Sequence, residues 1–194
     1  LMVEAGQSAC EHFPSEAIQV VPTTDRAAIP ELLELNELVD LCIPRGCEVL
    51  IRAVAECSRV PVIKHYKGIC SVYLDGSADI DKAVAITVNS KTHRTGVCNA
   101  METLLVDSRS AEQLLPAVGQ ALAEKGVEMR SCPPAKAILG DLAVEATNED
   151  WDTEYLDLIC SVRVVDGVDG ALEHINRHGS GHTECIVTED EATA

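Results

Sequence analysis

Short apolar runs alternate with segments of helical periodicity along most of the chain. The apolar runs predict strands at 17–21, 39–43, 60–63, 69–74, 104–106, 127–129, 143–146, 158–165 and 185–187. Helical spacing predicts helices at 2–12 and 26–35, around 49–54, from 78 onward, between 108 and 126, and at 168–176. Paired prolines at 133–134 predict a loop. Strands and helices that alternate with short connections predict an α/β fold with a parallel sheet.

Cys98 lies in the predicted connection between a helix and the 104–106 strand, where functional residues often collect on a rigid frame. Gly96 would allow a tight turn that presents the thiol. Lys91, His93 and Arg94 are close to it in the sequence, and cationic neighbours lower the pKa of a thiol. Cys98 is therefore a candidate nucleophile, although a buried cysteine that serves only as a small hydrophobe is the common alternative.

Charge narrows the range of partners. The net charge of −17 argues against nucleic acid and anionic membranes, because phosphate groups require clustered Lys and Arg. Residues 45–94 nevertheless carry eight basic against five acidic side chains, which would attract a small anionic ligand there. A set of solvated charges on helix surfaces is an equal alternative. Arg45 and Gly46 form a turn that opens a predicted helix, and helix N-termini attract anions. The chain has neither a G-x-G-x-x-G nor a P-loop motif, so the residues alone favour a plain surface turn here.

Cysteine and histidine usage predicts a reducing compartment and no metal. The nine cysteines form no C-x-x-C pairs, which is typical of cytoplasmic proteins rather than of disulfide frameworks. No apolar run is long enough to cross a bilayer, so we expect no membrane partner. His174, His178 and His182 recur every four residues, but glycines interrupt the helical pattern between the last two. We therefore predict no metal site.

Four ordered segments resemble one known family. They are Val39–Gly46, Pro61–Cys70, Val97–Val106 and Gly181–Asp190, and together they resemble the γ-glutamyl phosphate reductases (glutamate-5-semialdehyde dehydrogenases) of the aldehyde dehydrogenase superfamily. The resemblance implies an aldehyde-dehydrogenase-like α/β fold in two parts. Residues 1–65 would be the end of a Rossmann-like domain that binds the nicotinamide cofactor, and residues 66–194 would be an α/β catalytic domain that is incomplete at its C-terminus.

The resemblance also implies roles for particular residues. Cys98 would attack L-glutamyl 5-phosphate to form a thioester, which hydride from NADPH would reduce to glutamate 5-semialdehyde in proline biosynthesis. Arg45 and Gly46 would face the cofactor pyrophosphate, and Glu154 would hold the nicotinamide ribose, although a solvated acidic face is an equal alternative for Glu154. Lys64 stands where hydrolytic relatives carry a general-base glutamate, which suits an acyl-enzyme that exchanges with phosphate rather than water.

The resemblance covers roughly the middle half of such an enzyme. It implies a homo-oligomer at full length, the upstream glutamate 5-kinase as a possible partner, and a segment that could be inactive alone. Two other functions remain open. One is a different oxidoreductase of the superfamily that acts on another aldehyde through the same cysteine. The other is a non-catalytic interaction module that retains the fold.

Overall fold

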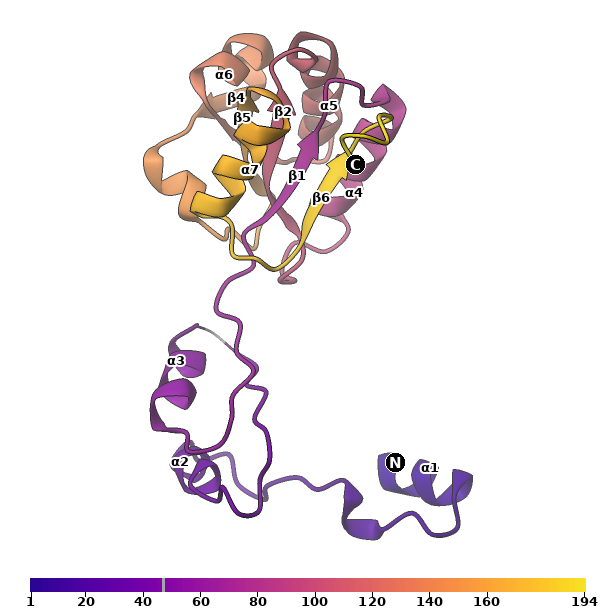
Figure 1. The fold of residues 1–194 in the computed structure, drawn as a ribbon, viewed down its shortest axis with the longest axis vertical. Helices are drawn as coiled ribbons and strands as arrows, with labels where there is room; N and C mark the ends of the chain where they lie inside the picture. Colours follow the sequence, from indigo (N-terminus) through magenta and orange to yellow (C-terminus); the bar gives the residue numbers. More distant parts are fainter. Residues whose placement is uncertain (47) are drawn as a thin grey trace. The chain divides into compact units, whose positions relative to one another are not determined.

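The computed structural model describes residues 1–46 and 48–194, which divide into two compact units, Leu1–Lys64 and His65–Ala194. The described residues of the first unit form three helices and one short 3-10 helix (Figure 1). These are α1 (Met2–Ala9), η1 (Ser15–Ala17), α2 (Ala28–Leu33) and α3 (Glu48–Cys57). Its buried apolar side chains are those of Leu33, Ile51, Val54 and Val60. Helices α2 and α3 thus supply most of its small core.

The strands expected in the first unit are largely absent from its described residues. The 17–21 run begins in η1 and then continues without pairing, and Val20 in it is 88% exposed. The runs at 39–43 and 60–63 meet only at one parallel bridge, between Cys42 and Val62. Apolar runs become strands only when another strand accepts their backbone hydrogen bonds. The described residues of this unit supply such pairing at that single bridge, so these three expectations were wrong for this chain.

The second unit is built on a six-stranded parallel sheet, which confirms the predicted α/β fold (Figure 1). The strand order is β4-β3-β5-β2-β1-β6, and every neighbouring pair is parallel. The strands are β1 (Cys70–Leu74), β2 (Met101–Asp107), β3 (Glu128–Ser131), β4 (Ala143–Glu145), β5 (Ile159–Val165) and β6 (Glu184–Val187). Every residue of β1 and β2 is buried, as expected for central strands covered on both faces.

Helices cover both faces of this sheet. They are α4 (Ile80–Thr92), α5 (Ala111–Glu124), α6 (Pro133–Leu139) and α7 (Gly167–His178), with short 3-10 helices η2 (Gly140–Leu142) and η3 (Asn148–Asp152). Helices α4, α5 and α6 pack on the face that presents Val72 and Leu104. Helix α7 packs on the opposite face, against Tyr73 and Leu105 (Figure 1). The alternation of neighbouring strand residues between the two faces therefore produces two separate cores.

Helix ends follow local chemistry, with two departures from expectation. Asp79 caps α4, because its side chain accepts a hydrogen bond from the Lys82 amide at 2.9 Å. Helix α5 begins after Ser110 rather than Ser108, and Gly126 follows its end with φ +77°. The paired prolines do not form a loop but occupy the first turn of α6, where their missing amide hydrogens cost nothing.

A polar cluster lies where β1 and β2 end. Asp75 and Asp107 are buried there, and the Arg109 guanidinium lies between their carboxylates, 3.4 Å from Asp75 Oδ1. Burial alone would raise the pKa of Asp75, but hydrogen bonds from Ser77 and Thr188 outweigh it and hold that pKa at about 2. This cluster fixes the carboxyl edge of the sheet, opposite the edge that carries Cys98. Among the described helices, none is long and apolar enough to cross a membrane.

Candidate active site

Cys98 lies in the connection between α4 and β2, at the amino ends of the strands. Residues 97–100 form a turn in which the Ala100 amide donates to the Val97 carbonyl at 3.0 Å. The Cys98 side chain is exposed on this turn. Its backbone amide has no hydrogen-bond partner among the described residues. An accessible thiol next to an unpaired amide is an arrangement that can attack a carbonyl carbon and stabilise the resulting oxyanion.

The segment that leads into β1 packs directly against this turn. A Cβ added at Gly68 would lie 1.9 Å from the Cys98 carbonyl oxygen and 2.9 Å from its Cα, so only glycine fits there. Two residues on, the Cys70 thiol donates to the same carbonyl oxygen at 3.2 Å. Burial, followed by the charge of Glu184, raises the pKa of Cys70 to about 11. Cys70 therefore keeps its proton at neutral pH and can act as this donor.

The expected role of Gly96 is wrong. It has no positive φ, and a Cβ added there would meet nothing within 4 Å. The glycine that the nucleophile turn requires is Gly68, which is 30 residues before Cys98 in the sequence. Sequence reasoning missed Gly68 because a close approach between two distant segments leaves no local pattern.

Lys91 also differs from expectation. Its side chain is fully buried, and Nζ forms an ion pair with Glu102 Oε2 at 2.8 Å, so its charge is matched inside the fold. His93 and Arg94 are exposed beyond the end of α4. Lys91, one of the three cations expected around the thiol, thus belongs to a buried structural ion pair instead. Burial raises the pKa of Glu102, and the hydrogen bond and charge of Lys91 act against that rise.

The loop before β5 brings Glu154 to the same place. Its Oε1 accepts a hydrogen bond from the Gly68 amide at 2.8 Å, and the side chain is half-buried. Glu154 Oε2 makes no hydrogen bond within the described residues, so it can still accept one from a ligand. Gly68 is therefore a common neighbour of Glu154 and Cys98. Arg45 and Gly46 belong to the first unit, where both are exposed ahead of α3 and Gly46 has φ +147°.

The loop before β6 and the first residue of that strand contribute contacts that sequence reasoning did not predict. Ser180 Oγ accepts from the Ile69 amide at 2.9 Å, and Glu184 Oε2 accepts from the Ser71 amide at 2.8 Å. These bonds hold the backbone on either side of Cys70, whose thiol is 4.0 Å from His182 Nδ1. For Glu184 the available signal was the resemblance of residues 181–190 to a known family, which assigned it no role. Ser180 lies just outside that segment.

The three regularly spaced histidines do not gather. The rings of His174 and His178 lie 4.7 Å apart, whereas His182 contacts Cys70 and packs edge-on against His65. Burial, with the nearby Arg163 charge, lowers the pKa of His174 to about 4. Within residues 1–46 and 48–194, no group of three or more His, Cys, Asp or Glu side chains is placed to hold a metal ion.

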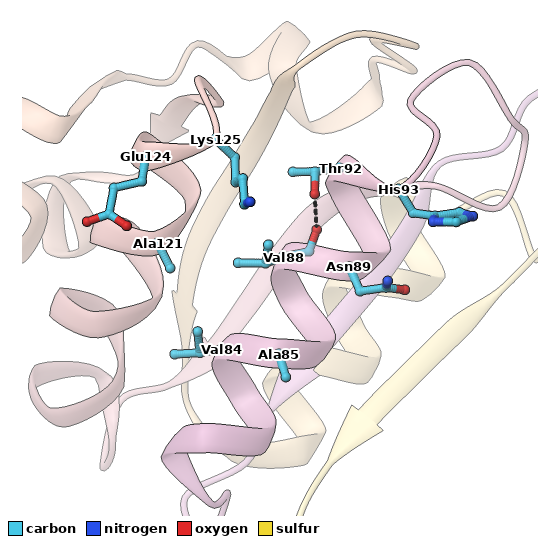
Figure 2. Close-up of a pocket in the computed structure, with 9 residues that line it drawn as sticks. All are labelled: Val84, Ala85, Val88, Asn89, Thr92, His93, Ala121, Glu124 and Lys125. Atoms are coloured by element: carbon cyan, nitrogen blue, oxygen red, sulfur yellow. Dashed lines mark hydrogen bonds between the residues drawn. The ribbon is translucent and has the colours of Figure 1, made fainter.

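A groove between α4 and α5 lies apart from these residues. Figure 2 shows Val84 and Val88 of α4 on the side of that helix toward Ala121 of α5, with His93 near one end and Glu124 and Lys125 on α5 and its C-cap. Its volume is 510 Å³. None of Cys98, Gly68 and Glu154 lines it. The candidate reactive site is therefore the turn that carries Cys98 rather than this groove.

Comparison with known proteins shows which proteins the chain resembles. No protein-family model matches it. An acetylating aldehyde dehydrogenase from Geobacillus thermoglucosidasius, 23% identical, has the same fold, with a TM-score of 0.70 over 99% of this chain and 50% of its own. The second unit and this structure thus share an aldehyde-dehydrogenase-like α/β fold, which was predicted.

Two proteins with higher sequence identity narrow the resemblance further. A γ-glutamyl phosphate reductase from Anaeromyxobacter sp. (strain Fw109-5) is 55% identical over 185 residues, which cover 94% of this chain and 43% of that protein. The crystal structure of γ-glutamyl phosphate reductase from Thermotoga maritima matches with a TM-score of 0.88 and 41% identity, over 99% of this chain and 47% of its own. The chain is a relative of γ-glutamyl phosphate reductases and spans less than half of their length, which confirms the predicted resemblance.

Proposed function

We propose that the full-length protein reduces L-glutamyl 5-phosphate with NADPH, giving L-glutamate 5-semialdehyde and phosphate in proline biosynthesis. The observation that carries the proposal is the 55% identity to a γ-glutamyl phosphate reductase over 94% of the chain. The exposed Cys98, on a turn fixed by Gly68 and Cys70, supports it because the reaction requires an accessible nucleophile.

The chain's own residues can supply the acyl-transfer steps. The Cys98 thiolate attacks the acyl carbon, the C–O bond to phosphate breaks, and phosphate leaves with the bonding pair to give a thioester. The unpaired Cys98 amide is placed to stabilise the oxyanion of this attack, and one such donor is typically worth about 100- to 1000-fold in rate. When bound, NADPH supplies hydride to the thioester carbon. Collapse of the resulting thiohemiacetal releases the aldehyde and restores the Cys98 thiolate.

We assign the cofactor to Glu154, Arg45 and Gly46. Glu154 fits a ribose because its Oε2 is available while Oε1 is fixed by the Gly68 amide. The exposed turn at Arg45 and Gly46, ahead of α3, fits a pyrophosphate because a guanidinium and helix amides both favour anions. A buried metal is not part of this proposal.

The test is an assay of the protein at the full length of its relatives. Phosphate-dependent reduction of NADP by glutamate 5-semialdehyde should be measured for the native protein, for Cys98→Ser and for Cys57→Ser. Cys57 is an exposed cysteine in the first unit and serves as the matched control. Cys98→Ser should lower the rate by about 1000-fold or more, and Cys57→Ser should leave it unchanged. An unchanged rate for Cys98→Ser would refute the mechanism.

Two alternatives have different outcomes. Equal activity with simple aliphatic aldehydes would indicate another oxidoreductase of the superfamily. If the protein is a non-catalytic module, Cys98 should react with iodoacetamide no faster than Cys10 or Cys57, which are also exposed. Selective labelling of Cys98 that NADP or substrate slows would exclude that module.

The remaining proposals concern the cellular setting. We propose a cytoplasmic homo-oligomer that receives its acyl phosphate from glutamate 5-kinase. Size-exclusion chromatography of the full-length protein tests the oligomer. Co-purification with glutamate 5-kinase tests the association with the kinase. A monomer that does not bind the kinase would contradict both the oligomer and that association.

A further inference from the structure

The Lys91–Glu102 ion pair is completely enclosed in the second unit. Both side chains are 0% exposed, and Nζ lies 2.8 Å from Oε2. Lys91 belongs to the last turn of α4, and Glu102 is the second residue of β2. The pair therefore joins the two ends of the segment 93–100, and Cys98 is on the turn between them. The ion pair therefore fixes the distance between the end of α4 and the start of β2.

The same carboxylate also reaches the loop before β5. Glu102 Oε1 accepts a hydrogen bond from the Leu156 amide at 3.2 Å. Leu156 is the one non-glycine residue of the described ranges with a positive φ, +54°. Such a conformation persists in a bulky residue only when its surroundings impose it. Glu154, two residues earlier, then meets the Gly68 amide.

Stability alone does not explain why an ion pair occupies this position. Apolar residues of similar volume usually replace a buried ion pair without loss of stability, whereas removal of one partner is costly. The enclosed pair contributes something that apolar packing lacks, which is a directed acceptor for the Leu156 amide and a directed donor from α4. Both are positional effects.

We propose that Lys91 and Glu102 are positioning residues that hold the Cys98 turn and the Glu154 loop in register with each other. The proposal rests on the proposed function for its kinetic consequence. Its structural part, the restraint of Leu156 and of the 93–100 segment by one carboxylate, does not depend on that function. The two parts can therefore be tested separately.

Two double variants separate the roles of the pair. Lys91→Met with Glu102→Leu removes both the ion pair and the Leu156 acceptor, while it keeps an apolar core. Lys91→Met with Glu102→Gln removes the charges but retains a carbonyl oxygen that can accept from the Leu156 amide. Hydrogen exchange of the Leu156 amide should be about tenfold faster in the first variant and close to the native rate in the second.

The kinetic readout uses the full-length protein. In the Met/Leu variant we expect KM for NADPH to rise about tenfold, because Glu154 is no longer held, while the melting temperature changes by only a few degrees. In the Met/Gln variant KM for NADPH should rise by a smaller factor, because that variant keeps the acceptor for the Leu156 amide but lacks the donor from α4. An unaltered Leu156 exchange rate and an unaltered KM in the folded Met/Leu variant would overturn the proposal.

Failure of the proposed function would look different. If native full-length protein has no reductase activity, the proposed function fails, and the exchange rates still decide the positioning role. If neither variant folds, the native chain decides it, because the restraint requires the Leu156 amide to exchange at least about tenfold more slowly than an unprotected amide. Exchange at the unprotected rate would overturn the proposal.

Discussion

Gly68→Ala is the sharpest test of how the nucleophile turn is built. The added Cβ would lie 1.9 Å from the Cys98 carbonyl oxygen, whereas ordinary contact begins at 3.4 Å, so one backbone segment must move by about 1.5 Å. The three nearest atoms, the carbonyl oxygen, carbonyl carbon and Cα of Cys98, all belong to the backbone of the turn and cannot rotate away as a side chain would. Displacement by about 1 Å at a reacting group can cost about 100-fold in rate.

We expect kcat/KM of the full-length Gly68→Ala variant to fall about 100-fold, with a stability loss of about 1–3 kcal/mol from overpacking. The assay is phosphate-dependent reduction of NADP by glutamate 5-semialdehyde, with urea unfolding measured on the same samples. The loss of activity should greatly exceed the small fraction of protein that is unfolded.

Gly96→Ala is the matched control. It adds the same methyl group two residues from Cys98, at a position with open space and no positive φ. Activity and stability should be close to those of the native protein. Equal effects of the two substitutions, or native activity in Gly68→Ala, would refute the close approach of Gly68 to the turn.

Three further substitutions test other contacts. Asp75→Asn should make the free energy of unfolding less dependent on pH in acid. The native carboxyl has its pKa held at about 2, against 3.8 in the unfolded chain, so it stabilises the fold above pH 3.8 by about 2 kcal/mol and loses this as the pH falls towards 2. Urea unfolding at pH 6 and pH 3 measures the difference. Gly46→Ala should destabilise α3 by about 1–3 kcal/mol, because φ of Gly46 is +147° and the new Cβ would lie 2.8 Å from Leu50 Cδ2. Amide hydrogen exchange in α3 should become faster, and an unchanged exchange rate would contradict the prediction. Cys70→Ala should lower kcat/KM about fivefold, because it removes the donor to the Cys98 carbonyl, whereas Cys70→Ser keeps a donor and should retain the native value. Equal kcat/KM values for the two variants would exclude a role for that hydrogen bond.

The second unit follows its sequence pattern closely. The runs at 69–74 and 104–106 lie in or overlap β1 and β2, because strands buried on both faces are largely apolar. The runs at 158–165 and 185–187 overlap β5 and β6. The helix that leads to Cys98 and the one that ends before Gly126 were also predicted. The first unit differs because strand pairing is sparse there. Among its described residues the 17–21 run has no paired strand, and the 39–43 run pairs only at the Cys42–Val62 bridge.

The candidate site was only partly readable. Cys98 was identified from its place between a helix and a strand, and it is exposed there. Lys91 was taken for a cation near the thiol, because sequence distance cannot tell which way a helical side chain points. In the fold it is enclosed with Glu102. The roles of Cys98, Glu154, Arg45 and Gly46 remain predictions.

The sequence by itself determined the alternation of strands and helices, the family resemblance and the candidate nucleophile, because those depend on residues close together along the chain. Tertiary structure alone decided which groups surround that nucleophile. The Gly68 amide and the Glu154 carboxylate are 86 residues apart, and the Ser71 amide and the Glu184 carboxylate are 113 apart. A parallel sheet brings the amino ends of distant strands to one edge, so such contacts depend on strand order and leave no periodic signal in the sequence.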